Sequence, residues 1–256
     1  MIHLKTTEEI DLIARGGKII SDLLSEIPSR IHPGVSTLAL DAFSDEFIRS
    51  HQGAVPAFKG LYGFSGSVCT SLNEEVVHGV PNASRTLVEG DIISIDVGVK
   101  LGGWCSDSAW TFPVGVIDDD SSRLMAVTEE SLAAAVAAAC PGNHVGDIGA
   151  AVMGQVSGTG LSIIKDLVGH GVGRNVHEEP QVPNLGKAGL GPRLREGMVL
   201  AIEPMLSFGG PDIKTQDDHW TVVTLDGTRT AHFEHTIAVT SGDPRILTAT
   251  RVELPA

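Results

Sequence analysis

One order of predicted elements occurs twice along this chain, and that repetition constrains the fold more than any other feature. In the first half, apolar residues recur at helical spacing over residues 10–27, Pro33-Gly34 interrupts the pattern, and a second helical segment precedes strand-like runs. In the second half, an alanine-rich helix is expected over residues 122–140, and Pro141-Gly142, another helical segment and further strand-like runs follow. Superposing the two Pro-Gly pairs gives an offset of 108 residues. Identity between the halves is weak, so duplication and coincidence are both open.

A duplicated chain would fold into two similar α+β halves with a functional site between them. The halves would run roughly over residues 1–118 and 119–256. No Pro- or Ser-rich linker separates them, so we expect one catalytic domain over residues 1–256 rather than two independent ones.

Composition excludes several classes of function. With 42% hydrophobic and 20% charged residues, the chain can bury a full core. A net charge of −14 disfavours binding to nucleic acid or to anionic lipid. The longest apolar run, residues 132–140, is too short to cross a bilayer, and residues 1–9 lack a secretory pattern. Cys69, Cys105 and Cys140 are widely spaced and odd in number, which favours a reducing, cytoplasmic location.

Two aspartates fall in consecutive strand-like runs. Alternation over residues 92–99 places Asp96 on one face of a strand, and a second run, residues 104–112, contains Asp107. Glycines between the runs suit a tight hairpin. With Leu101-Gly102 as the two-residue turn, the two aspartates become direct cross-strand neighbours with Cβ atoms about 5 Å apart.

Like charges at that separation destabilise a hairpin unless something compensates for them. A shared proton would raise the pKa of one carboxyl group, and a bound cation would turn the repulsion into chelation. A solvated turn with two surface acids is a third interpretation, against which the flanking apolar residues argue.

Three more donors lie in similar surroundings. His170 stands between two glycines, Glu203 ends an apolar run immediately before Pro204, and Glu234 lies in an alternating strand-like run. Each alone is explained as a core residue satisfied by a base or by backbone amides. Bases are scarce near all of them, however.

Taken together, four carboxylates and one imidazole are too anionic for a single zinc ion. The set of Asp96, Asp107, His170, Glu203 and Glu234 suits two divalent ions, with Co, Mn, Fe or Zn all compatible with nitrogen and oxygen ligands. Two such ions form a hydrolytic device that activates water and polarises a carbonyl group. The residues alone therefore predict a metallohydrolase without naming its substrate.

The same residues, read in order, resemble the methionine aminopeptidase family of the bacterial type I class. The resemblance covers nearly the whole chain and is carried by Asn73-Glu74-Glu75-Val76-Val77-His78-Gly79-Val80-Pro81, Ile95-Asp96-Val97-Gly98 with Asp107, Gly169-His170-Gly171-Val172-Gly173, His177-Glu178-Glu179-Pro180, Ile202-Glu203-Pro204-Met205 and Glu234-His235-Thr236.

The resemblance implies a pita-bread fold, which is an α+β fold with a pseudo-twofold antiparallel sheet, helices outside and the site between the halves. It implies removal of the initiator methionine from nascent polypeptides when the second residue is small, by attack of a metal-bound hydroxide on the scissile carbonyl. It further implies a monomer that acts on the N-termini of nascent chains, with transient ribosome contact and no membrane or sequence-specific nucleic-acid binding.

The resemblance also assigns residue roles. Asp96 would chelate one metal ion, Asp107 and Glu234 would bridge both, and His170 and Glu203 would complete the other. Glu203 would also move the proton of the attacking hydroxide. The catalytic residues His78 and His177 would hydrogen-bond the substrate near the scissile amide.

A pocket for the methionine side chain follows by position in the motifs. Its walls would be Phe58, Leu61, Phe64, Cys69, Val176 and Trp220. Val176 stands where the family commonly has an aromatic residue, and Phe58 and Leu61 also depart from the family pattern. These departures are expected to reshape the pocket and to relax its strictness for methionine.

Two alternatives are open at the sequence level. A proline-cleaving dipeptidase or aminopeptidase of the same fold shares the five ligands, but such relatives usually add a large N-terminal domain, and only about 90 residues precede Asp96 here. A binding module that has lost catalysis is the second alternative, and the intact set of five donors argues against it.

Overall fold

The structure, a computed structural model, describes residues 1–249. Its helices are α1 (Thr7–Glu26), α2 (Thr37–Ser50), α3 (Asp119–Ala138) and α4 (Val145–Val156), with short 3-10 turns η1 (Ile27–Arg30) and η2 (Leu61–Gly63). The strands are β1 (Ala54–Pro56), β2 (Val68–Leu72), β3 (Glu75–Val77), β4 (Ile92–Leu101), β5 (Trp104–Pro113), β6 (Ser162–Ile163), β7 (Val168–Gly171), β8 (Glu178–Pro183), β9 (Val199–Ile202), β10 (Met205–Ser207), β11 (Ile213–Thr215), β12 (Val222–Thr224), β13 (Thr230–His232), β14 (His235–Ala238) and β15 (Arg245–Ile246).

The helix starts follow local capping chemistry. Thr6 and Glu9 form the expected capping box of α1, and the Ser36 side chain accepts the Ala39 N–H at the start of α2. Helix α3 begins three residues earlier than the alanine-rich pattern indicates, because Asp118 accepts the Ser121 N–H and caps it there. Each of these caps satisfies a backbone donor that the helix itself leaves free.

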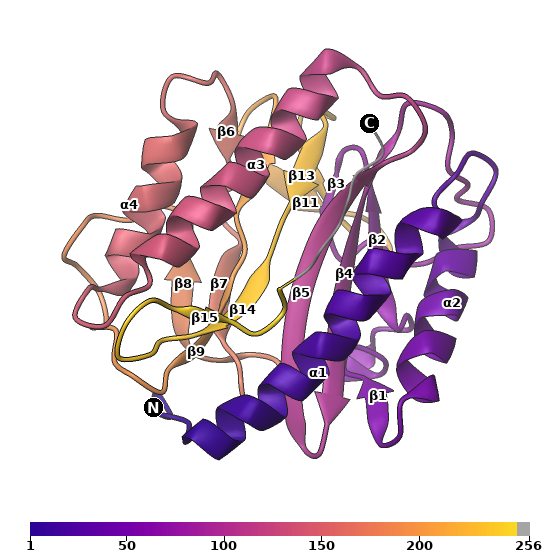
Figure 1. Ribbon diagram of the computed structural model, residues 1–256. Helices are drawn as coiled ribbons and strands as arrows, with labels where there is room; N and C mark the ends of the chain where they lie inside the picture. The colour runs from indigo at the N-terminus through magenta and orange to yellow at the C-terminus, as the bar shows by residue number, and fades with distance from the viewer. Residues whose placement is uncertain (250–256) are drawn as a thin grey trace.

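The repeated order of elements is visible in the structure. The N-cap residues of α2 and α4, Ser36 and His144, are separated by the offset of 108 residues that the two Pro-Gly pairs indicate. Helices α1 and α2 cover the sheet of the first half, and α3 and α4 cover that of the second (Figure 1). The α+β prediction with helices on the outside is therefore confirmed.

Every strand pairing in the described residues is antiparallel. A first-half sheet has the order β1-β4-β2 with β5 beside β4, and a second-half sheet has the order β15-β14-β9-β7-β8. Two three-stranded sheets, β13-β10-β6 and β11-β12-β3, complete the strand layer.

Strands β5 and β14 lie side by side where the halves meet, joined mainly through side chains. Thr236 Oγ1 donates to the Asp107 carbonyl at 2.7 Å and accepts the Asp107 N–H at 3.1 Å. Ser108 Oγ donates to the Glu234 carbonyl at 2.5 Å. These hydrogen bonds hold Asp107 and Glu234, which belong to different halves, next to each other.

The main hydrophobic core lies between the helices and the sheets. It contains fully buried side chains from both halves, among them Leu24, Ile95, Val152 and Ile237. Within residues 1–249, no helix is long and apolar enough to cross a membrane.

Candidate metal centre and active site

The two aspartates of the first half lie on a long, regular hairpin. Strands β4 and β5 pair along all ten residues of each and close at Leu101/Trp104, so that Gly102 and Gly103 form the turn with φ of 59° and 84°. Positive φ at both central residues is the requirement of a type I′ turn, and glycine meets it without steric cost.

The predicted register of this hairpin is therefore wrong, because each residue pairs with a partner two positions away from the predicted one. Asp96 lies opposite Ala109, and Asp107 lies opposite Gly98, because Leu101 stays in the strand and the two glycines take the turn. The shift moves each partner by two residues, so both carboxylates still project from the same face. They are diagonal neighbours rather than directly opposed ones.

The backbone around His170 is unusually close to its neighbours. A β-bulge falls between His170 and Gly171, where β7 pairs with β8. A Cβ on Gly169 would come within 2.3 Å of the Ala201 carbonyl oxygen, and one on Gly171 would come equally near the Glu179 carbonyl oxygen. The two glycines that flank the histidine therefore allow three strand segments to pack tightly around it.

The hydrogen bonds of His170 fix its tautomer. Nδ1 lies 3.0 Å from the Gly171 carbonyl oxygen, which can only accept, so the proton is on Nδ1. The unprotonated Nε2 then faces two carboxylates, at 3.5 Å from Glu203 Oε1 and 3.9 Å from Asp107 Oδ2. Burial, aided by the neighbouring His177, lowers the pKa of His170 to about 4, so the ring is neutral at pH 7.

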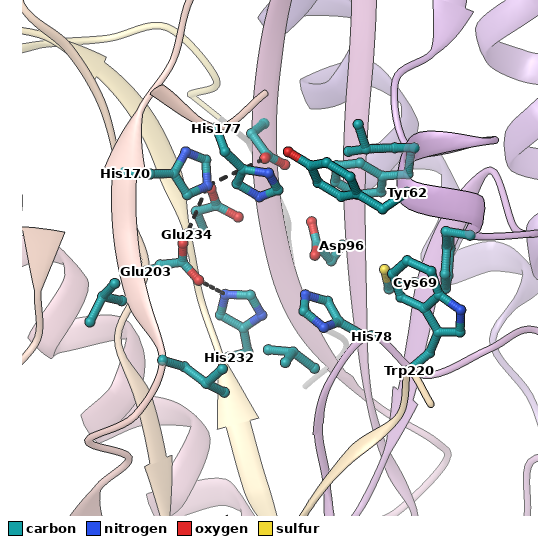
Figure 2. A pocket seen from close by; sticks show the side chains of 17 residues that line it. Tyr62, Cys69, His78, Asp96, His170, His177, Glu203, Trp220, His232 and Glu234 are labelled. Carbon is teal, nitrogen blue, oxygen red and sulfur yellow. Dashed lines mark ion pairs between the residues drawn. The ribbon is translucent and has the colours of Figure 1, made fainter. Parts of the chain in front are cut away.

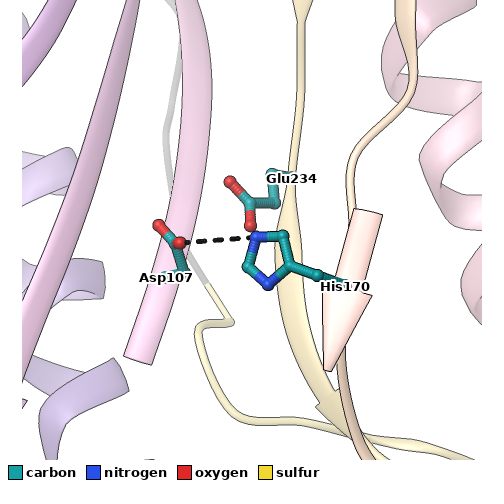
Figure 3. A group of neighbouring side chains, drawn as sticks. All are labelled: Asp107, His170 and Glu234. Atoms are coloured by element: carbon teal, nitrogen blue, oxygen red, sulfur yellow. Dashed lines mark ion pairs between the residues drawn. The ribbon is translucent and has the colours of Figure 1, made fainter. Parts of the chain in front are cut away.

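The two glutamates lie where strands end. Glu203 follows β9 directly, before Pro204, and its carbonyl oxygen accepts the Asn184 side-chain amide at 3.0 Å. Glu234 lies between β13 and β14, and its N–H donates to the Ala109 carbonyl at 2.9 Å. Both carboxylates thereby leave the regular sheet. Glu203 points toward His170 and His232 (Figure 2), and Glu234 lies beside Asp107 of the first half (Figure 3).

These elements bring all five predicted donors to one cavity wall. One ligand atom each from Asp107, His170 and Glu234 lie within 4.8 Å of one another (Figure 3). Asp107 comes from the first half, and His170 and Glu234 come from the second. The group is thus assembled only where the halves meet.

The carboxylates of this group have no compensating basic side chain in the described residues. Burial raises the pKa of Asp96 to about 7, and burial together with the charges of neighbouring carboxylates raises the pKa values of Asp107, Glu203 and Glu234 well above their usual range. Within residues 1–249, no lysine or arginine forms an ion pair with any of these four carboxylates.

Unsatisfied atoms point to the same conclusion. Asp96 Oδ1, Asp107 Oδ1 and Glu234 Oε1 are buried and have no hydrogen-bond partner in the described part of the chain. Oxygen donors with one neutral imidazole are the ligands that borderline divalent cations accept. The residues present therefore fit divalent metal ions, which would neutralise the carboxylates and use their free lone pairs.

A cavity of about 280 Å³ opens beside the donors (Figure 2). Five of the six residues that the resemblance places in a methionine pocket line it: Phe58, Leu61, Phe64, Cys69 and Trp220. Val176 is not among the described residues that border the cavity. It is 4% exposed and packs into the apolar cluster behind the wall, because the chain presents the adjacent His177 to the cavity instead.

Both predicted catalytic histidines reach this cavity. His78 follows β3 with φ of 59°, an uncommon conformation for a residue with a side chain. Such strain is found preferentially at functional sites. His177 lies at the exposed rim, with its ring edge-on to His170 at a centroid distance of 4.4 Å and stacked on Tyr62 at 6.2 Å.

Five of the lining residues were not predicted from the sequence: Tyr62, Val77, Leu167, Val168 and His232. His232 is the most notable, since its side chain is 2% exposed, neither ring nitrogen has a hydrogen-bond partner among residues 1–249, and Nε2 lies 3.6 Å from Glu203 Oε2. Its position two residues before Glu234 in a strand-like run was the signal for it. The apolar residues carried no signal distinguishable from that of core positions.

A buried set of carboxylates and imidazole between two halves of an antiparallel α+β fold defines a metallohydrolase. The chain matches the model of metallopeptidase family M24 over residues 11–241. We conclude that it belongs to this family.

Two methionine aminopeptidases are similar to this chain over nearly their whole length. Methionine aminopeptidase 1 of Bacillus subtilis (strain 168) is 50% identical over 248 residues, which are 97% of this chain and 99% of the relative. The crystal structure of methionine aminopeptidase from Thermotoga maritima superposes with a TM-score of 0.95 at 43% identity, covering 97% of this chain and 99% of that one. The prolidase from Pyrococcus horikoshii OT3 shares the fold, with a TM-score of 0.80 at 24% identity, covering 98% of this chain and 65% of that one.

Proposed function

We propose that this protein is a metallo-aminopeptidase that removes the initiator methionine from nascent polypeptides whose second residue is small. The observation that carries the proposal is the uncompensated donor set beside an apolar cavity. The 50% identity to methionine aminopeptidase 1 of B. subtilis supports the choice of substrate.

In this proposal, Asp96, Asp107, His170, Glu203 and Glu234 would hold two divalent ions, which could be Co, Mn, Fe or Zn. Asp96 would be a ligand of one ion, His170 and Glu203 of the other, and Asp107 and Glu234 of both. Such ions would supply polarisation of the scissile carbonyl group and a water of lowered pKa.

The chain's own side chains handle the proton and the substrate. Glu203 accepts the proton of the attacking water, a task that suits a carboxylate whose pKa is raised by burial. His78 and His177 donate hydrogen bonds to the substrate near the scissile amide. Burial lowers the pKa values of both, so they act as neutral donors that do not repel the substrate's amine.

The apolar wall selects the side chain of the first residue. Phe58, Leu61, Phe64, Cys69 and Trp220 form a surface suited to a thioether, which is flexible and polarizable. Burial raises the pKa of Cys69 well above its usual range, so its thiol acts as an apolar wall atom rather than as a nucleophile.

The wider setting of the proposal is a monomer in the cytoplasm, with residues 1–256 working as one catalytic domain. Its partners are the N-termini of nascent chains, with transient contact to the ribosome. The acidic net charge of −14 fits a protein that binds no nucleic acid in a sequence-specific way.

The test is peptide cleavage by the purified protein, with Met-Ala-Ser and Ala-Pro peptides as substrates, each with and without chelator. We expect methionine release from Met-Ala-Ser, loss of that activity with chelator, and its return on adding divalent metal. Cleavage of Ala-Pro instead would favour a proline-specific dipeptidase. A folded protein that cleaves neither peptide with any divalent metal would be a binding module.

A further inference from the structure

A buried ion pair joins the N-terminal segment to the loop that carries His177. Lys5 Nζ lies 2.9 Å from Glu178 Oε2, and the two side chains are 2% and 12% exposed. The partners are 173 positions apart in the sequence. Two charges this well shielded are stable only when paired, and removing one partner leaves the other buried without compensation.

The Glu178 carboxylate organises the bend that precedes it. Its Oε1 accepts the Asn175 N–H at 3.2 Å, and a Cβ on Gly173 would come within 2.5 Å of either carboxylate oxygen. Burial alone would raise the pKa of Glu178, but the hydrogen bonds from Lys5 and from the backbone outweigh it and lower the pKa. The ionised carboxylate therefore fills the inside of the bend formed by residues 173–178.

Lys5 is itself held in place by the backbone. Its N–H donates to the Gly197 carbonyl at 2.7 Å, and Gly197 has φ of +88°, with so little space that an added Cβ would come within 2.8 Å of the Lys5 carbonyl oxygen. The segment around Gly197 leads directly into β9, which precedes Glu203. The ammonium group is thus presented to the bend from a fixed point of the second-half sheet.

His177 depends on this bend for its position. Its ring packs edge-on against His170 and stacks on Tyr62, and within residues 1–249 no hydrogen bond holds either ring nitrogen. It directly precedes Glu178, the first residue of β8. Its placement therefore follows from where the backbone at Glu178 is anchored.

We propose that Lys5 is a positioning residue for catalysis, whose ammonium group acts through Glu178 to set the place of the His177 ring at the cavity rim. The inference rests on the catalytic role proposed for His177. A displacement of about 1 Å in a catalytic group can reduce the rate by about 100-fold, so a remote anchor of this kind has a measurable effect.

The first test is the variant Lys5→Met, assayed on Met-Ala-Ser at saturating metal. We expect kcat to fall by about 10- to 100-fold with little change in KM, and Lys5→Arg, which keeps the charge, to recover most of the loss. Lys18→Met is the matched control, because Lys18 pairs with Asp22 on the exposed face of α1 and should leave both constants unchanged.

An unpaired Glu178 in Lys5→Met could unfold the protein instead. The double variant Lys5→Met/Glu178→Gln removes both charges together and should fold, yet should keep the reduced kcat. Full kcat in this double variant would overturn the inference.

A double-mutant cycle with His177→Ala separates positioning from general stability. If Lys5 acts through His177, Lys5→Met should lower kcat in the wild-type background and have no further effect in the His177→Ala background. Equal losses in both backgrounds, or no loss in either, would overturn the inference. A wild-type protein inactive on Met-Ala-Ser would instead refute the proposed function, so the two failures are distinguishable.

Discussion

The two halves of the molecule deliver their donors in different ways. The first half uses a regular hairpin, in which Asp96 and Asp107 lie within fully paired ten-residue strands. The second half uses irregularities, because His170 adjoins a β-bulge, Glu203 follows the end of β9, and Glu234 lies between β13 and β14.

The difference shows how the work of building the site is divided. A regular ladder holds its side chains by many backbone hydrogen bonds and needs no bound ion to stay in shape. The irregular segments rely on a few separate hydrogen bonds, such as Asn184 to the Glu203 carbonyl and Glu234 N–H to Ala109. The first half is therefore a fixed platform, and the second half supplies the parts that a metal ion would complete.

The largest expected effect comes from removing, from each half of the molecule, the carboxylate that is proposed to be a ligand of both metal ions. Asp107→Asn and Glu234→Gln should each lower kcat/KM by at least about 1,000-fold, since metal-ion catalysis is worth several kcal/mol. Metal content measured with the peptide assay checks both variants, and Asp212→Asn, at an exposed acid, is the control. More than a tenth of wild-type activity at saturating metal in either variant would contradict the assignment.

A second prediction concerns pH. Asp96 has a native pKa of about 7 against an ordinary value of 3.8, so the native metal-free protein holds its proton more tightly than the unfolded chain does. The Asp96 contribution to the free energy of unfolding of the metal-free protein should therefore fall as the pH rises from about 4 to about 7. It is measured as the difference from Asp96→Asn, because His170, whose pKa is lowered, acts in the opposite direction over this range.

Divalent metal should reverse this loss, because it binds the deprotonated carboxylates. Thermal unfolding at pH 5 and pH 7.5, with and without metal, measures both effects. We expect the metal to raise Tm at pH 7.5 by more than about 4 °C, and by less at pH 5. Hydrogen exchange should show that metal protects the backbone amides of residues 203, 233 and 234 more than those of β4; equal protection would remove the distinction between the halves.

A smaller effect is expected in the pocket wall. Gly98 faces Asp107 across the hairpin, and a Cβ there would lie 2.5 Å from the Phe58 ring. Gly98→Ala should push this ring into the cavity and raise KM for Met-Ala-Ser about tenfold with little change in kcat, the scale at which an apolar pocket senses a methylene group. Gly154→Ala, at a helical glycine with open space around it, is the matched control, and the same rise in KM there would refute the steric explanation.

The smallest effect concerns a helix far from the chemistry. Ser36→Ala removes the side-chain cap of α2 and should lower the free energy of unfolding by about 1 kcal/mol while leaving kcat/KM unchanged. Chemical denaturation and the peptide assay measure the two quantities. A loss of activity at constant stability would mean that the first half is less independent of the site than the hairpin indicates.

Much of the fold could be predicted from local chemistry. The capping box at Thr6, the Ser36 cap and the Pro-Gly breaks place the helices, because these signals act within one turn of the chain. The start of α3 differs from the predicted one because the side-chain cap of Asp118, and not the alanine-rich run, sets where this helix begins.

The site was harder to predict, since it depends on register and on contacts between halves. The hairpin prediction failed at the choice of turn, although two adjacent glycines able to take positive φ were visible in the sequence. Val176 was misplaced for a different reason. Which side of an irregular strand faces a cavity is decided by packing, and an apolar residue leaves no trace of that decision in the sequence.

The position of Trp220 gives the molecule an optical reporter of its own. Trp220 lines the cavity and packs edge-on against Phe64 at a centroid distance of 5.2 Å. Trp104 lies beneath the Arg174 guanidinium, and Trp110 packs on Phe233 on the face of β5 opposite Asp107. A ligand that enters the cavity would displace water from one indole and leave the other two as an internal reference, so occupancy could be followed by fluorescence without any label.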